Sequence, residues 1–404
     1  MANALSPYFP EFWAKTAQVL HKPRAIYRQI ANFRGESVLK NGDVFHRILP
    51  NTTQIQDYTR YSDIDGQDIN GTDETLTVDS EKAFRFSVDD FDEIQSNLSL
   101  AQTYAKNAMT DLTNVLDSDL LYEAVNATST VDDETIGGSS DTPITLAGSN
   151  VFETFTKVQQ KLGEQNVDLN SLYGVIDPAT AQIISSQVGG RETSFGDTVT
   201  RNGFMGNMLR YNGMDLFVTN NYTSSIELSI ATQPTNGDTV VFTIAGEAVT
   251  FTFVTTIGTT AGNVLIGASA DTARANLETL INAPGTTTAQ GVALTGTDLY
   301  LLQQSVAVDT AADDTLDFYA KGKTVVGTET LTDATDGFVA AKASRHLQFG
   351  RKGAVDMVVQ DKPNMAVRLE PKHFAGNVMG RSLYGIKTYT DGAAQLVDVR
   401  VLLS

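Results

Sequence analysis

A run of acidic residues between positions 63 and 74 comes nearest, by its spacing, to a metal site. Asp63, Asp65 and Glu74 fall at positions 1, 3 and 12 of an EF-hand loop, where carboxylate oxygens would bind calcium. That loop requires glycine at position 6 for its sharp turn, and this sequence has Asp68 there. Helices should flank such a loop, whereas strand-like alternation flanks this one. We interpret the segment as an exposed acidic turn and keep the calcium loop as the alternative.

No other pattern in the sequence supports catalysis or cofactor binding. The chain has four histidines, and none is spaced to form a metal-ligand pair: His21, His46, His346 and His373. The sequence contains no Gly-x-Ser-x-Gly, no phosphate loop and no dinucleotide fingerprint. Acid pairs such as Asp132 and Asp133 lie in polar segments, where carboxylates stay solvated rather than tuned for proton transfer. We therefore expect no enzyme, no cofactor and no bound metal.

The composition indicates a folded protein of several domains. The chain has 404 residues, of which 41% are hydrophobic and 19% charged, so it can bury real cores in two or three domains. It has no run of about 18 apolar residues, so we expect no membrane-spanning helix. The N-terminus lacks a basic stretch followed by an apolar one, so we expect no secretion signal. Cysteine is absent, which excludes disulfides and thiolate chemistry and fits a reducing cytoplasm.

Charge is distributed unevenly along the chain. The formal net charge is −19, yet residues 1–40 carry six Lys or Arg against Glu11 and Glu36. This basic segment of +4 leaves −23 on the remainder, so the body should not coat nucleic acid through phosphate contacts. A basic arm on an acidic body suggests an arm that lies on an acidic neighbour, and a solvated basic tail is the alternative.

The basic arm is also rich in aromatic residues: Tyr8, Phe9, Phe12, Trp13, Tyr27 and Phe33. Prolines at positions 7, 10 and 23 divide it into short pieces. Aromatic and arginine side chains dominate interface hot spots, so we expect the arm to bury them against another chain. Packing onto the chain's own body is the alternative.

Residues 43–88 show the alternation that is typical of β-strands. Apolar and polar residues alternate at 54–59, at 76–78 and at 84–88, on either side of the acidic segment 61–74. Two glycines and many acids mark that segment as a turn region. We predict a long β-hairpin with an acidic tip.

Residues 91–127 form the clearest predicted helix. Neither Gly nor Pro interrupts them. Apolar residues recur at steps of three and four, giving one stripe: Phe91, Ile94, Leu98, Ala101, Ala105, Ala108, Leu112 and Val115. No partner segment with a heptad pattern is present, so we predict a strut rather than a coiled coil.

An α/β segment follows a polar linker. We predict helices at 152–162 and 179–186, separated by a buried strand that Pro178 stops. Asn212-Gly213 then leads into a strand over 214–221, and alternating strands end the chain near 396–401.

Residues 224–336 have a different composition and read as an inserted α+β domain. They contain no Met, Trp or His and carry 13 acids against three basic residues. The pattern predicts a helix from a Ser269 or Asp271 cap to about Asn282. It predicts strands at these positions: 239–245, 247–255, 292–295, 298–304 and 315–320.

The order of these elements resembles the major capsid proteins of tailed phages, which share the HK-ninety-seven fold. Residues 172–179 (LYGVIDPA) look like the family's buried strand, proline and helix. Residues 202–221 look like its glycine-containing loop and the strand that ends in Thr-Asn-Asn. Residues 374–387 with 396–402 look like its C-terminal end. The resemblance covers about 290 residues in two stretches, with 224–336 as a departure from the minimal pattern.

The resemblance implies an α+β capsid fold with six parts. These are an N-terminal arm (1–40), an extended hairpin loop (41–90), a spine helix with peripheral domain (91–149), a first axial part (150–223), the insertion domain (224–336), and a second axial part with C-terminal peripheral strands (337–404). It implies a structural protein that assembles in the bacterial cytoplasm into the icosahedral shell of a virion. The subunit-interface candidates are Phe12, Trp13, Arg24, Tyr27, Arg28, Asp63, Asp65, Asp68, Asp73 and Glu74.

The partners implied are further copies of the chain in hexamers and pentamers, a portal, and scaffolding, decoration or head-completion proteins. Double-stranded DNA would be enclosed without specific binding, and no membrane would be involved. Two other functions fit part of the pattern. A cellular encapsulating nanocompartment shell would share the fold, and a surface or adhesion protein would suit the Thr-rich acidic insertion but requires an export signal.

Overall fold

The computed structural model describes residues 21–39, 42–64, 66–89, 100–189, 209–333, 335–369 and 375–403. The chain divides into two compact units. The first unit comprises Met1–Lys22, Asp79–Thr113 and Val359–Tyr384, and the second comprises Pro23–Val78, Asn114–Val358 and Gly385–Ser404.

The first unit contains most of a three-stranded sheet of long strands. Its order is β17 (Asp356–Leu369), β18 (Ala375–Lys387) and β3 (Ser80–Asp89). Strand β18 pairs antiparallel with β3 from Ala375 opposite Asp89 to Tyr384 opposite Ser80.

The long helix α3 spans Leu100–Tyr122 and continues as the 3₁₀ turn η3 (Glu123–Asn126), which confirms a long helix within the predicted range 91–127. Its predicted first turns, with Phe91, Ile94 and Leu98, lie outside the described residues. Ala105 and Leu112 of the predicted stripe are buried, as an amphipathic strut requires.

A ten-stranded sheet forms the centre of the second unit. Its main path runs β12, β13, β8, β16, β5, β7, β6, while β15 pairs with β8, and β19 pairs with both β16 and β4. The strands are β4 (Ser129–Val131), β5 (Leu172–Ile176), β6 (Leu209–Tyr211), β7 (Met214–Val218), β8 (Thr223–Ser229), β12 (Ser305–Thr310), β13 (Thr315–Ala320), β15 (Gly337–Phe338), β16 (Ser344–Arg351) and β19 (Leu396–Leu402).

The α/β part of this unit confirms the sequence prediction closely. Helices α4 (Val151–Glu164) and α5 (Pro178–Gly189) flank the buried strand β5. The Asp177 side chain accepts a hydrogen bond from the Thr180 backbone N–H at 3.2 Å, which caps α5 where Asp-Pro predicted a start. Phe155 of α4 packs edge-on against Phe349 of β16 in the core that these elements share. Asn212 and Gly213 both have positive φ, 48° and 78°, and so form the tight turn between β6 and β7.

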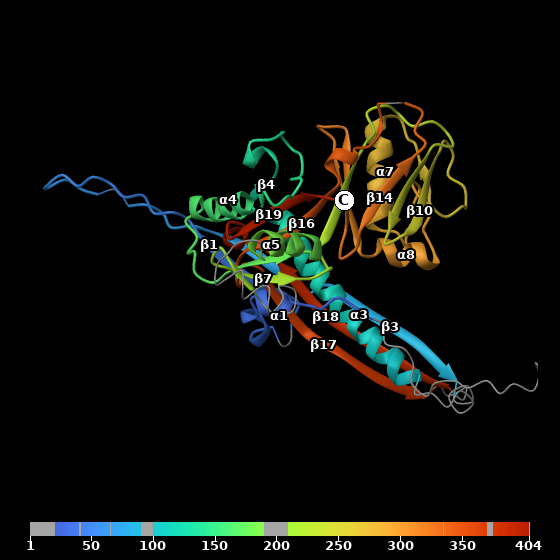
Figure 1. Cartoon of the computed structure of the whole chain (residues 1–404), viewed down its shortest axis with the longest axis horizontal. Coiled ribbons are helices and arrows are strands. Elements are labelled where there is room, and N and C mark those ends of the chain that lie inside the picture. The colour runs from blue at the N-terminus through green and yellow to red at the C-terminus, as the bar shows by residue number, and fades with distance from the viewer. Residues whose placement is uncertain are drawn as a thin grey trace, which may run out of the picture. The chain divides into compact units, whose positions relative to one another are not determined.

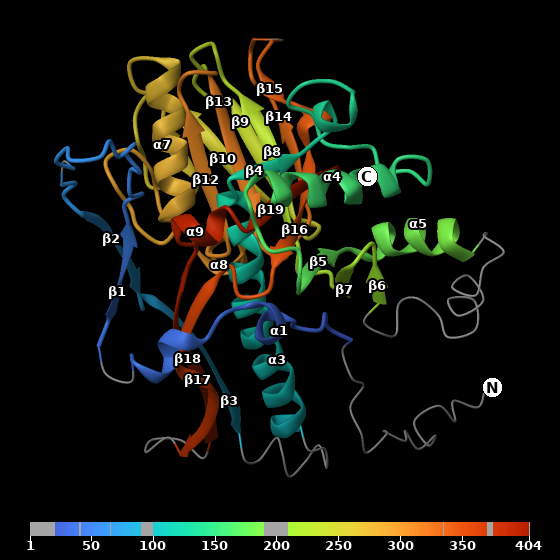
Figure 2. The same cartoon turned by 90° about the vertical axis from the view of Figure 1, so that its left-hand side faces the viewer.

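Residues 224–336 contribute to two sheets rather than one. A four-stranded sheet, β11-β10-β9-β14, belongs to them alone, with β9 (Thr239–Ile244), β10 (Glu247–Val254), β11 (Asn263–Leu265) and β14 (Val325–Glu329). Strands β12, β13 and most of β8 also come from this segment but belong to the ten-stranded sheet. Helix α7 (Ala270–Asn282) lies beside β10 and β12 (Figure 2), and one apolar core joins helix and sheets.

The predictions for this segment have a mixed outcome. The strands at 239–245, 247–255 and 315–320 are confirmed, and so is the helix, whose cap is Ser269: its Oγ accepts a hydrogen bond from the Thr272 N–H. The strand predicted at 298–304 is wrong, because residues 298–302 belong to helix α8 (Gly296–Leu302). The strand predicted at 292–295 is wrong, because these described residues lie in no strand of the structure. Strand β12 was not predicted.

The hydrogen-bonded strands of the hairpin are shorter than predicted. Strands β1 (Val44–Pro50) and β2 (Gly71–Thr77) pair antiparallel from Val44 opposite Thr77 to Pro50 opposite Gly71, which confirms a hairpin. The strand predicted at 54–59 is wrong, because the described residues 51–70 contain no named strand. The strand at 84–88 is β3, which pairs with β18 and is not a hairpin arm.

The remaining elements are short: α1 (Tyr27–Ile30), η2 (Arg34–Ser37), η4 (Glu134–Ile136), η5 (Ala340–Lys342) and α9 (Thr390–Ala393). Among the described residues, no helix has both the length and the apolar character needed to cross a lipid bilayer.

Candidate subunit interfaces

The base of the hairpin is fixed to its own unit by polar contacts. Arg47 of β1 makes ion pairs with Asp356, at 3.0 Å, and with Asp391 at the start of α9. The Glu74 carboxylate accepts hydrogen bonds from the backbone N–H and the hydroxyl of Thr390, and these bonds lower the pKa of Glu74. Of the predicted interface residues, Glu74 therefore has partners within the chain.

Asp73, another interface candidate, also has a partner within the hairpin. Its carboxylate lies 2.7 Å from Nδ1 of His46 on the opposite strand. Both side chains remain more than half exposed, so the pair does not remove Asp73 from the surface. This polar contact joins the two strands at their base and still faces solvent.

Beyond β1 and β2 the hairpin continues as two extended segments that run outward from the unit (Figure 1). The Asn51 N–H donates to the Asn70 carbonyl at 3.1 Å, and the Gln54 N–H donates to the Gln67 side chain at 2.7 Å. These bonds hold the two segments side by side, although they form no regular β-ladder. Residues 51–70 are called the hairpin tip below.

The hairpin tip exposes large apolar side chains together with its acids. Ile55 is 99% exposed and Tyr61 100% exposed. The other exposed apolar residues of the tip are Tyr58, Ile64 and Ile69. Asp63 and Asp68 are exposed as predicted, while Asp65 lies outside the described residues. An isolated hairpin is barely stable in water, and contiguous exposed apolar residues mark interaction surfaces.

A buried carboxylate is one of the groups that attach the arm to the body, beside backbone hydrogen bonds of Ile30 and Asn32 with residues 353–357. Oδ1 of Asp117 on α3 accepts hydrogen bonds from the backbone N–H groups of Ile26 and Tyr27, at 2.8 and 2.7 Å. Its Oδ2 accepts a bond from the Asn221 amide at 2.8 Å. Asp117 thereby caps the N-terminus of α1 from a distant helix. Burial raises the pKa of Asp117, while these bonds oppose the shift.

The arm candidates occupy different environments. Arg24 and Arg28 are exposed, as an interface role requires. Tyr27 is buried within its own chain, at 4% exposure, so it is not carried into the proposed interface. Phe12 and Trp13 lie outside the described residues. Asp117 was not identified from the sequence. The only feature of the sequence that could have indicated it is a carboxylate beside Leu116 in an otherwise apolar helix face.

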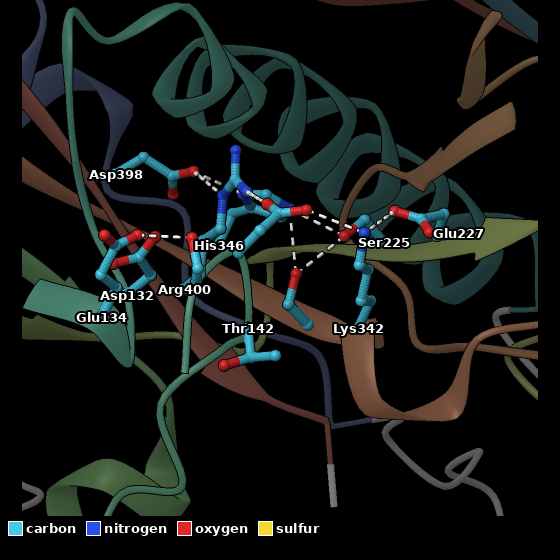
Figure 3. A network of polar contacts seen from close by, with 12 residues as sticks. Asp132, Glu134, Thr142, Ser225, Glu227, Lys342, His346, Asp398 and Arg400 are labelled. Carbon is cyan, nitrogen blue, oxygen red and sulfur yellow. Dashed lines mark hydrogen bonds and ion pairs between the residues drawn. The ribbon is translucent and has the colours of Figure 1, made fainter. Parts of the chain in front are cut away.

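A second polar cluster joins three strands of the central sheet (Figure 3). Nδ1 of His346 on β16 lies 2.7 Å from the Asp398 carboxylate on β19, and its Nε2 lies 2.9 Å from the Ser225 hydroxyl on β8. This order of groups is that of a nucleophilic triad. However, the Ser225 hydroxyl also lies 2.8 Å from that of Ser344.

All three groups of this cluster are nearly buried, at 8% for Ser225, 3% for His346 and 2% for Asp398. We therefore assign the cluster to holding β8, β16 and β19 together. A polar pocket of about 630 Å³ opens beside it, and Lys342 there bridges Asp141 and Glu227, at 2.8 and 2.9 Å. No role was assigned to His346 from the sequence, because no second histidine lies at ligand spacing, and its actual partners are 121 and 52 residues away along the chain.

The acidic tip gives no support to the calcium alternative among the residues whose placement is described. Within those residues no three His, Asp or Glu side chains converge as metal ligands. Glu74 and Asp73 sit on a strand and are engaged with Thr390 and His46. An EF-hand would instead place its twelfth position at the start of a helix.

Comparison with known proteins establishes the fold. No protein-family model and no curated protein sequence matches the chain. The structure is similar to one from Mycobacterium phage Che8, with a TM-score of 0.57 at 15% identity over 97% of this chain and 96% of that one. It is also similar to the capsid structure of cyanophage P-SCSP1u, with a TM-score of 0.52 at 9% identity over 100% and 96%. The chain therefore has the fold of tailed-phage capsid structures, as the resemblance of its sequence implied.

Proposed function

We propose that this chain is the major capsid protein of a tailed phage. Copies would associate as hexamers and pentamers of an icosahedral shell that encloses double-stranded DNA in the virion. The role is structural, and the candidate residues other than the buried Tyr27 and the internally bonded Glu74 serve contacts between subunits. The shared fold supports this proposal because the cyanophage structure, which nearly the whole chain matches, is described as a capsid.

The observation that carries the proposal is the exposed hairpin tip. Its aromatic and aliphatic side chains have no cover within the part of the chain that the structure describes, and the tip makes few bonds of its own. Exposing such a segment in an isolated protein is unfavourable by roughly 25 cal/mol for each Å² of apolar surface. Contact with a further copy of the chain removes that cost, and repeated contacts of this kind generate a closed assembly.

The charge of the chain suits a wall around DNA rather than a DNA-binding surface. The net charge of −19 opposes close approach of phosphates, so packing would not depend on attraction to the subunits. The six-part division given by the resemblance, from the arm 1–40 to the C-terminal part 337–404, forms part of this proposal. So do a portal, scaffolding, decoration and head-completion proteins as partners, and assembly in the host cytoplasm.

Electron microscopy of the protein purified after expression by itself tests the proposal. We expect rings, shells or open lattices with hexameric units. A protein that stays monomeric at concentrations above about 10 mg/ml, with and without a crowding agent, would contradict it. Particles that enclose a co-expressed enzyme, and that contain no DNA when isolated from the host, would favour the nanocompartment alternative.

A further inference from the structure

The polar pocket beside the cluster of Ser225, His346 and Asp398 has one face of the central sheet as its floor. Its volume is about 630 Å³, and it lies within the second unit. On β8 and β13 the residues that line it alternate with residues of an apolar core on the opposite face of the sheet. The strand residues of the floor are Ser225, Glu227, Ser229, Thr315, Asp317, Tyr319, Ser344 and His346. Buried polar groups need hydrogen-bond partners, so this floor suits a polar or charged ligand rather than an apolar one.

The floor places two carboxylates directly opposite each other. Asp317 of β13 pairs in register with Glu227 of β8, and like charges at opposed positions of neighbouring strands repel. Lys342 makes an ion pair with Glu227 at 2.9 Å (Figure 3). Asp317 makes neither an ion pair nor a hydrogen bond among the described residues. Burial and the facing Glu227 raise the pKa of Asp317, and the attraction of Arg400 and Lys342, which lie beyond ion-pair distance, does not cancel this effect.

The pocket as a whole has an excess of negative charge. Its lining includes four carboxylates and two permanent cations: Asp141, Glu227, Asp313, Asp317, Lys342 and Arg400. Both cations are engaged on the Asp141 side, where Lys342 lies 2.8 Å and Arg400 3.4 Å from that carboxylate. Asp313, in the turn between β12 and β13, is exposed and has no ion pair among the described residues. The β12–β13 end of the pocket therefore has two carboxylates without a cation at ion-pair distance.

Two hydroxyl groups of the floor also lack partners. Tyr319 is 8% exposed and Thr315 is 9% exposed, and both line the pocket. Neither side chain makes a hydrogen bond within the part of the chain that the structure describes. They lie on the same face of β13 as Asp317, two residues after it and two residues before it. Because buried hydroxyls normally find partners, these two are available as acceptors for the N–H groups of a ligand.

We propose that this pocket binds a small aliphatic diamine at its β12–β13 end. One ammonium group lies between Asp317 and the Tyr319 hydroxyl, and the other between Thr315 and Asp313. Successive residues on one face of a strand are about 7 Å apart, which is close to the separation of two nitrogens joined by a chain of four carbons. The site takes no part in the proposed contacts between subunits, so the inference goes beyond the proposed function.

A divalent metal is the other kind of cation that carboxylates bind. Calcium takes about six to eight oxygen ligands, and magnesium requires a nearly ideal octahedron. Among the residues whose placement is described, no three acidic or histidine side chains converge in this way. An ammonium group has three rotatable donors and needs no fixed geometry, so an amine fits the pocket better than a metal does.

Calorimetric titration of the full chain with putrescine, a diamine with four carbons, tests the inference. We expect one saturable site per chain in the wild type. Asp317→Asn removes the charge and keeps the shape of the side chain, and it should weaken binding about tenfold or more, because charge-assisted hydrogen bonds are strong. Tyr319→Phe removes only the hydroxyl and should weaken binding about threefold to tenfold. Circular dichroism checks that each variant is folded.

The matched control is Glu247→Gln, which removes one charge at an exposed position outside the pocket. It should bind putrescine as the wild type does. Butylamine, with a single ammonium group, should bind about tenfold more weakly than putrescine, because it loses one charge-assisted contact. Calcium and magnesium chloride should not displace putrescine.

Four results would overturn the inference. The wild type could show no saturable binding, or Asp317→Asn could bind putrescine as tightly as the wild type, which would assign the attraction to the general negative charge of the chain. Displacement of putrescine by calcium would assign the pocket to a metal. Butylamine that binds as tightly as putrescine would exclude a ligand held at both ends. Binding is measured whether or not the chain assembles, so failure of this inference is distinguishable from failure of the proposed function.

Discussion

At the scale of single residues, Asp117 is the side chain that caps the first turn of helix α1 in the arm. One of its oxygens accepts both the Ile26 and the Tyr27 backbone N–H groups. Asp117→Ala would leave these buried donors without an acceptor, and an unsatisfied buried donor costs about 1–3 kcal/mol. We expect this variant to lose about 2–4 kcal/mol of unfolding free energy in urea, with earlier proteolysis near residue 26.

The matched control is Asp117→Asn, which keeps an acceptor oxygen but removes the charge. Burial raises the pKa of Asp117 in the folded state, so the folded protein holds this proton at pH values where the unfolded chain has released it. This group's contribution to stability is therefore greatest at low pH and declines as pH rises from its ordinary value through the raised one. Above that window the Asn variant should be at least as stable as the wild type, and a loss as large as that of Ala would contradict the capping role.

Substitution of His346 gives a second prediction at this scale, because it tests whether the cluster of Ser225, His346 and Asp398 is structural or reactive. His346→Leu leaves the buried Asp398 carboxylate without its imidazole partner, although Arg400 remains 3.4 Å away. Removing a hydrogen-bond partner from a buried polar group costs about 1–3 kcal/mol and more for a carboxylate, so we expect a loss of about 3 kcal/mol in chemical denaturation. Ser225→Ala should cost only about 1 kcal/mol, typical of one hydrogen bond. Labelling of Ser225 by a fluorophosphonate would show instead that the serine is nucleophilic.

At the scale of elements, the hairpin tip should matter for assembly and not for the fold of the subunit. Replacing Tyr58, Tyr61 and Ile64 by serine removes side chains that are exposed in the single chain. Surface changes of this kind usually alter stability by less than about 0.5 kcal/mol each. We therefore expect a subunit with nearly unchanged thermal unfolding and a severe loss of particles in electron microscopy.

Leu76→Ala, also in the hairpin, is the control with the opposite signature. Leu76 is fully buried, and truncating a buried leucine costs about 2–5 kcal/mol. It should lower the melting temperature of the isolated subunit. If the triple serine variant destabilised the subunit as much as Leu76→Ala, the tip would be part of the subunit's own core.

Elements with local signals could be predicted from the sequence, and those set by partners could not. Helix α5 follows Asp177-Pro178, and α7 follows Ser269, so capping chemistry located both. The run at 298–304 has four adjacent apolar or aromatic residues, which fit a buried strand and a short helix equally well. Residues 54–59 alternate like a strand but have too few partners for a ladder. Pairing of β3 with β18 joins segments almost 300 residues apart, and local pattern cannot reveal it.

The candidate interfaces follow the same rule. Composition located the acidic tip and the basic arm, because runs of charge are local. The triad-like cluster around His346 brings together segments from distant parts of the chain. It had no spacing that could be recognised in the sequence.

At the scale of the whole molecule, the segment 224–336 joins the rest of the central sheet through β8 and also contacts helix α3 through Tyr319 and Lys321. Strand β8 pairs with β16 through three residue pairs only, with Ser344, Arg345 and His346 on the β16 side. The segment's own sheet, its capped helix and its apolar core account for most of its packing. Its net charge of −10 favours solvent over a wall that faces packed DNA, so we propose that it lies on the outer surface of the shell.

Replacing 224–336 with a short Gly/Ser linker should therefore leave assembly intact and lower heat stability. The loss arises because β16 no longer pairs with β8 and His346 loses the Ser225 contact. An excision of 230–336 keeps β8, together with its pairing to Phe338 of β15, and should recover part of the melting temperature. Electron microscopy and calorimetry of both variants, with circular dichroism of the isolated segment, make the comparison. Loss of all particles in both variants, with the isolated segment unfolded, would show that it is no independent domain, and density for it on the inner wall would contradict the outward placement.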